Sequence, residues 1–186
     1  MNLLIAGVAL WTIAHFFKRL APEMRAGMTA KMGEGSKGVM ALLILASIIL
    51  MVFGYRAAPF EFVYELPSFT RHINNTLMII SVIMLGMGNS KGHARTWLRH
   101  PMLWGVVLWS GAHLLVNGDI ASIVLFGGMA LWALANMVLI NVQEGAWEKP
   151  EAGPIKGDIK LLIISAVVFA VISGLHIWLG PNPFGG

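Results

Sequence analysis

The 186-residue sequence contains no cysteine, and this absence excludes several kinds of site. There is no disulfide framework, no thiol nucleophile, and no cysteine-ligated zinc or iron–sulfur centre. Any metal must therefore be bound by histidine, methionine or carboxylate side chains. Carboxylates are also missing from the interior of the apolar segments, which disfavours zinc because zinc needs three or four close ligands.

Charged residues are scarce as well, at 12% of the chain against about 25% in ordinary soluble domains. With 57% apolar residues and a mean hydropathy of +0.74, the chain is expected to be an integral membrane protein with the lipid bilayer as its surroundings. The net charge of +4 does not indicate nucleic-acid binding. The basic residues lie in short loops between apolar runs, where the positive-inside rule explains them.

Six apolar segments predict an all-α, polytopic membrane helix bundle, with residues 1–186 as one integral membrane domain. The first segment is expected to be retained, because its charges follow the apolar run instead of preceding it as in a signal peptide. Pro22 and the run Gly33 to Gly38 predict a loop after this segment. The six predicted spans are 2–20, 38–57, 69–88, 100–117, 119–142 and 160–180.

Basic residues alternate between the loops and predict the orientation. Eleven of the thirteen lysines and arginines lie in segments 18–37, 89–100 and 143–160, whereas Arg56 and Arg71 lie on the other side. The first set is expected to be cytoplasmic, so both termini face the periplasm or exterior.

A short motif occurs twice. LWTIAHFF covers Leu10 to Phe17, and LWSGAHLL covers Leu108 to Leu115. In each copy a tryptophan precedes a histidine by four residues, so the two rings are expected to share one helix face. The two copies fall in spans that start on opposite sides of the membrane, which predicts an inverted three-plus-three repeat.

His15 and His113 are the candidate metal ligands. Each is expected about 20 Å from the start of its span, just past the middle of a core of about 30 Å. Two imidazoles on separate helices suit the axial ligands of a haem, with Trp11 and Trp109 packing against the ring. The alternative is an ordinary neutral histidine hydrogen-bonded between helices.

Further histidines are candidates for a supporting role in cofactor binding. His72 with the adjacent Arg71, and His176, are predicted near the external surface, where they would bind a haem propionate or an anionic substrate or anchor the interface. His100 lies at the cytoplasmic mouth of its span, before Pro101 in the first helical turn. His93 is expected to be an ordinary surface residue. Asp119 is expected to cap the helix of span five.

Several of these pieces together resemble the NnrU family of bacterial inner-membrane proteins along nearly the whole chain. The matching pieces are His15 with the segment Lys18 to Arg25, GEGSKG, RHIN from Arg71, RHPMLWG, LWSGAHLLVNGD followed by LFGG, and HIWLG. One departure is Phe16, where the family usually has serine.

The resemblance implies an association with bacterial nitrite and nitric oxide reduction (denitrification) and a multi-pass inner-membrane location. The similar plastid zeta-carotene isomerase is a membrane haem b enzyme whose two histidine ligands match His15 and His113 by motif. The resemblance therefore implies a haem-dependent redox enzyme or isomerase acting on a lipophilic or nitrogen-oxide substrate, or a sensor of nitrogen oxides.

Two other functions stay open at this point. RHP followed by an apolar helix also resembles membrane methyltransferases that use S-adenosylmethionine. Those proteins carry downstream glutamates in a helix, whereas Glu144, Glu148 and Glu151 are expected here in a loop. A non-catalytic assembly or regulatory role is the third alternative.

Overall fold

The computed structural model describes residues 1–180 and 182–184, and in this part of the chain the regular elements are helices. An isolated β-bridge between Phe62 and Asp119 is the exception. The all-α prediction is confirmed. The contacts group the helices into two compact units, one formed by Met1–Val63 and Asp119–Gly128 and the other by Tyr64–Gly118 and Met129–Gly186.

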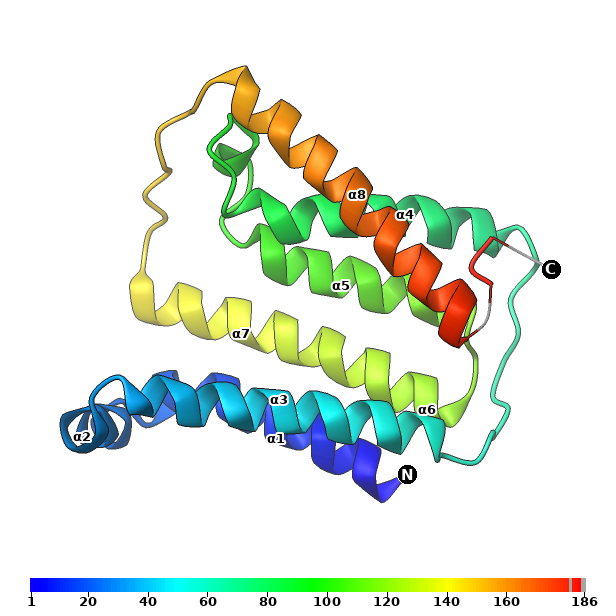
Figure 1. Ribbon diagram of the computed structural model, residues 1–186, viewed down its shortest axis with the longest axis horizontal. Helices are drawn as coiled ribbons and strands as arrows, with labels where there is room; N and C mark the ends of the chain where they lie inside the picture. Colours follow the sequence, from blue (N-terminus) through cyan, green and yellow to red (C-terminus); the bar gives the residue numbers. More distant parts are fainter. Residues whose placement is uncertain (181, 185–186) are drawn as a thin grey trace. The chain divides into compact units, whose positions relative to one another are not determined.

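Two glycines bring the main helices of the first unit together. Helix α1 (Asn2–Leu20) packs along α3 (Gly35–Arg56), as Figure 1 shows in blue and cyan. A Cβ atom on Gly54 would lie 2.3 Å from the backbone nitrogen of Leu4, and one on Gly7 would lie 2.7 Å from that of Met51. Small residues of this kind let the backbones of two membrane helices approach closely.

The connection between α1 and α3 contains a helix that the sequence analysis missed. Helix α2 (Pro22–Met32) occupies part of the predicted loop, with Pro22 in its first turn and Gly33 after its end at a φ of 54°. Proline is well suited to the first turn, because its missing N–H would have no helical partner there. None of the residues of α2 is buried, so no apolar stripe marks it in the sequence.

The first unit is completed by a later segment of the chain. A continuous helix runs through α6 (Ile120–Ser122), the π-helical turn η2 (Ile123–Gly127) and α7 (Gly128–Glu144). Asp119 caps its start by accepting a hydrogen bond from the backbone N–H of Ser122 at 3.0 Å, as predicted. The Ser122 hydroxyl in turn lies 2.8 Å from the Tyr55 hydroxyl of α3.

The second unit contains α4 (Thr70–Met87), the short helix η1 (Ala94–Thr96), α5 (Pro101–Leu114), most of α7, and α8 (Ile155–Leu179). Helices α4 and α5 pack closely, and the buried Ser81 hydroxyl donates to the carbonyl of Gly105 at 2.8 Å. Leu161 of α8 packs against Met84 and Met87 of α4.

Helix α5 ends earlier than the predicted span because polar side chains take its last carbonyls. The Tyr64 hydroxyl donates to the Leu114 carbonyl at 2.6 Å, and the Asn117 amide donates to the His113 carbonyl at 2.9 Å. The Thr70 hydroxyl donates to the Leu115 carbonyl at 3.0 Å. These bonds satisfy groups that a continuing helix would otherwise use.

Asp158 in the first turn of α8 fixes the loop that follows α4. Its two carboxylate oxygens accept hydrogen bonds from the backbone N–H groups of His93 and Ala94, each at 2.9 Å. The backbone of the loop also contacts the backbone of α8 beside Asp158. A Cβ on Gly157 would lie 2.3 Å from the backbone nitrogen of Gly92. The loop is therefore held to α8 by both polar and steric contacts.

We expect Asp158→Ala to loosen this loop while the helices stay folded. The two N–H groups lose a charged acceptor, so local opening becomes more frequent. Trypsin cleavage after Lys91 and Arg95, measured in detergent, should accelerate severalfold. Asp158→Asn should have a smaller effect, and Glu151→Ala, in an exposed coil, should have none. Unchanged cleavage in Asp158→Ala would show that the glycine contacts alone hold the loop.

Six helices of the structure correspond to the six predicted spans, but four of them are long and apolar enough to cross a membrane. These four are α1, α3, the helix Ile120–Glu144 and α8. Helix α5 has 14 residues, about 21 Å at 1.5 Å per residue, and α4 begins with the polar run TRHINN. The structure supports a membrane protein; the six-span count and the inverted repeat stay predictions.

Candidate functional site

Both copies of the tryptophan–histidine motif lie on helices, and in both the rings meet as predicted. On α1, the ring centroids of Trp11 and His15 are 4.1 Å apart with an angle of 32° between the planes. On α5, those of Trp109 and His113 are 5.2 Å apart at 55°. His15 belongs to the first unit and His113 to the second. Each imidazole is half-buried and has an indole against it.

The hydrogen bonds of these histidines to the backbone determine which ring nitrogen carries the proton. His15 Nδ1 lies 2.8 Å from the Trp11 carbonyl oxygen, and His113 Nδ1 lies 2.9 Å from that of Trp109. A carbonyl oxygen only accepts, so Nδ1 must carry the proton. The neutral ring then has its lone pair on Nε2, which is the form that binds a metal.

His176 has the same arrangement and lies beside His113. Its Nδ1 is 2.9 Å from the carbonyl oxygen of Ile172, and its ring centroid is 6.4 Å from that of His113. The sequence analysis did not pair these two residues. The spacing in the sequence could have indicated this pair. The predicted spans 100–117 and 160–180 run in the same direction, and His113 and His176 follow their starts by 13 and 16 residues, at similar depths.

His100 differs from these three histidines. Its Nε2 lies 2.8 Å from the side-chain oxygen of Asn141 on α7, and this oxygen only accepts. The proton is therefore on Nε2, and the preferred metal-binding nitrogen is already used. The residue also precedes Pro101 at the start of α5. His100 links α5 to α7, which is a structural role.

Arg99 makes a second link to the end of α7. The prediction that Glu144, Glu148 and Glu151 lie in a loop is partly wrong at this place. Glu144 is the last residue of α7 and does not lie in a loop, whereas Glu148 and Glu151 are in coil. The Arg99 guanidinium lies 3.7 Å from the Glu144 carboxylate and donates to the Gly145 carbonyl.

Arg71 and His72 lie in the first turn of α4 with exposed side chains. Within the described residues, no contact joins either of them to His113 or His176. His93 is exposed and its ring lies edge-on to Trp97, with the centroids 6.3 Å apart.

The described part of the chain contains no group of three or more histidine, aspartate or glutamate side chains placed to hold a metal ion. An axial haem pair needs only two imidazoles, and the donor chemistry of His15, His113 and His176 fits this demand.

A comparison with known families identifies the family of the chain. The sequence model of the family described as NnrU protein matches residues 3–183, which is nearly the whole chain. No curated protein and no solved structure shows significant similarity to the chain.

Proposed function

The chain belongs to the NnrU family, and from this premise we propose that it is a membrane protein that binds haem b through His15 and His113. The observation that carries the proposal is the shared geometry of the two motifs. In both, an indole packs on the imidazole and a carbonyl four residues earlier holds the proton on Nδ1. The motif resemblance to the plastid zeta-carotene isomerase, given in the sequence analysis, implies the same two positions as haem ligands.

The residues around each histidine suit a flat apolar cofactor. Phe16 and Phe17 follow His15, and Leu114 and Leu115 follow His113; all four are half-buried. The bond from Nδ1–H to the backbone fixes the orientation of each ring before any ligand binds, and it raises the basicity of Nε2. When bound, haem supplies a one-electron redox centre in an apolar environment.

The substrate class follows from the surroundings. A site in helices of this apolarity is reached most easily by lipophilic molecules or by small nitrogen oxides that dissolve in the bilayer. Redox chemistry or cis–trans isomerisation of a lipophilic substrate, and reactions or sensing of nitrogen oxides, are the activities that we assign to this site.

The orientation belongs to the same proposal. The chain lies in the bacterial inner membrane with both termini in the periplasm, because eleven of the thirteen basic side chains lie in segments 18–37, 89–100 and 143–160, at one end of the proposed spans. Helices α4 and α5 are the remaining two spans. Their shorter apolar lengths are compatible with spanning because irregular backbone at membrane depth is tolerated where protein surrounds it.

An absorption spectrum of the detergent-purified protein tests the proposal. We expect a Soret band and, after reduction with dithionite, sharp α and β bands of a six-coordinate haem, with a pyridine haemochrome of the b type. A protein that remains colourless after expression with a haem precursor would contradict the proposal. S-adenosylmethionine binding would then be the next measurement, because the RHP segment also resembles membrane methyltransferases.

A further inference from the structure

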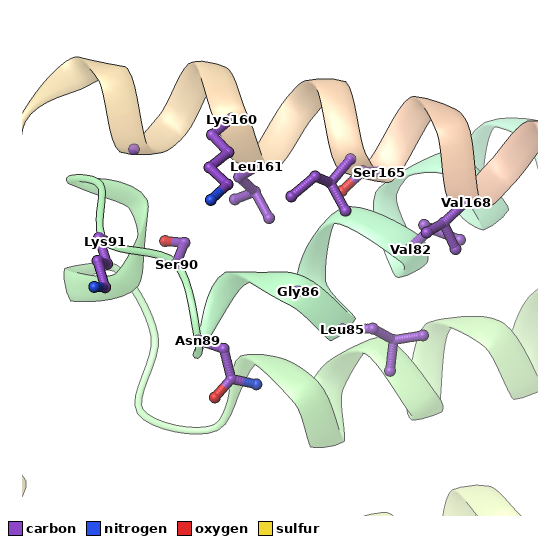
Figure 2. Close-up of a pocket in the computed structure, with 12 residues that line it drawn as sticks. Val82, Leu85, Gly86, Asn89, Ser90, Lys91, Lys160, Leu161, Ser165 and Val168 are labelled. Carbon is purple, nitrogen blue, oxygen red and sulfur yellow. The ribbon is translucent and has the colours of Figure 1, made fainter.

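A groove of about 520 Å³ lies between the end of α4, the loop after it and the first half of α8, all within the second unit. Figure 2 shows that its two ends differ in chemistry. Ser90 and Lys91 of the loop and Lys160 of α8 line one end. Apolar side chains, among them Val82, Leu161 and Val168, line the other. The groove is thus amphipathic along its length.

The polar end carries two basic side chains from different elements, Lys91 of the loop and Lys160 of α8. Within residues 1–180 and 182–184, neither lysine has a carboxylate at ion-pair distance. The nearby Asp158 carboxylate is hydrogen-bonded to the backbone of the loop. In Figure 2, Lys160 extends from α8 toward the loop that carries Ser90. Two ammonium groups at one end of a groove, neither of them in an ion pair, favour an anionic ligand group.

A buried hydroxyl points to the same end. The Ser90 Oγ atom is shielded from solvent and has no hydrogen-bond partner among the described residues. Leaving a shielded hydroxyl unsatisfied is unfavourable, so such a hydroxyl is expected to hydrogen-bond to water, an ion or a ligand group. An oxygen-rich anion beside Lys91 and Lys160 would accept a hydrogen bond from this hydroxyl.

The apolar end has the length of part of a lipid chain. Lys160 and Val168 are eight residues apart on α8, which is about 12 Å along the helix axis. Half of a bilayer core is about 15 Å. Val168 is 40% exposed at its end of the groove, and α8 is one of the four helices able to cross a membrane. The groove therefore has a length close to that of half a bilayer core.

We propose that this groove binds an anionic phospholipid, with the headgroup phosphate at Lys91, Lys160 and Ser90 and one acyl chain along Val82, Leu161 and Val168. Basic pockets between helices on the cytoplasmic side of a membrane are suited to anionic headgroups. The site is preorganised for the lipid, because Asp158 and the close contact of Gly92 with Gly157 hold the loop against α8. The proposal does not depend on haem.

Native mass spectrometry of the full chain, released from detergent with added lipid, tests the proposal. We expect the protein to retain phosphatidylglycerol in preference to phosphatidylcholine with the same acyl chains. Lys91→Gln with Lys160→Gln should reduce retention roughly ten- to thirtyfold, as expected for the loss of two basic contacts near a membrane surface. Lys18→Gln with Lys31→Gln, the same change of charge outside the groove, should leave retention unaltered.

The apolar part is tested separately by filling the groove. Val168→Trp should reduce retention, whereas Val171→Trp, at an exposed position of α8 that does not line the groove, should not. Equal retention of the two lipids, or unchanged retention in the double lysine variant, would overturn the proposal. Displacement of the lipid by millimolar inorganic phosphate, with no effect of Val168→Trp, would identify a phosphate site and overturn the assignment to a lipid.

Discussion

His113→Ala should yield a full-length protein that still inserts into the membrane but retains almost no haem. The substitution removes one of the two proposed axial ligands and leaves α5 apolar, so insertion is unaffected. Alanine also has a high helix propensity, and α5 is therefore expected to persist. The measurement is the ratio of haem to protein after purification, from the pyridine haemochrome and the protein concentration.

The remaining histidines identify the second ligand. If it is His15, as we propose, His15→Ala abolishes haem binding to the same extent, and His176→Ala retains a six-coordinate spectrum. If it is His176, whose ring lies 6.4 Å from that of His113, the two results are exchanged.

His93→Ala is the matched control for these variants. His93 is exposed, and its side chain contacts Trp97 on the loop after α4. Its removal should leave both the haem content and the spectrum unchanged. Full haem occupancy in a protein that lacks both His15 and His113 would show that the assignment of ligands is wrong.

Gly54→Ala is expected to disrupt the first unit, although it adds a single methyl group. The new Cβ would lie 2.3 Å from the backbone nitrogen and 2.7 Å from the Cα of Leu4, a residue with no exposed surface. Backbone atoms cannot rotate away as a flexible side chain does, so α1 and α3 must separate. Overpacking of this kind typically costs about 1–3 kcal/mol, and occasionally more.

Gly38→Ala on the same helix is the control that separates packing from helix propensity. Nothing lies within 4 Å of a Cβ at Gly38. There the substitution should be neutral or should stabilise the protein by up to ~1 kcal/mol, because alanine favours the helix over glycine. The two variants are thus expected to change stability in opposite directions. Equal midpoints of unfolding by sodium dodecyl sulfate would contradict the close α1–α3 contact.

Local sequence patterns were sufficient to predict the apolar helices and the paired rings. Helix α1 has the predicted bounds, because its apolar run ends at two adjacent basic residues, Lys18 and Arg19. The contact of each histidine with its tryptophan depends only on a spacing of four residues within one helix. The cap by Asp119 is equally local.

Features that depend on distant residues could not be predicted in the same way. The end of α5 is determined in part by Tyr64 and Thr70, which precede it by about 50 and 45 residues in the sequence. Helix α2 has no buried residue and hence no periodicity to reveal it. The groove at Lys160 combines a loop and a helix that lie about 70 residues apart in the sequence. The sequence of one segment alone therefore does not predict the polar end of the groove.

The discontinuous composition of the first unit has a consequence for biosynthesis. The chain leaves the ribosome from its N-terminus, so α1 and α3 are available to pack early. The Ser122 hydroxyl beside Tyr55 is made 67 residues later. The backbone N–H of Ile120, which donates to the carbonyl of Glu61 at 3.0 Å, is made 59 residues after Glu61. Between these events the ribosome synthesises the whole of α4 and α5. A nascent chain halted before Asp119 therefore contains an incomplete first unit, and insertion intermediates of this length should be the ones most readily degraded.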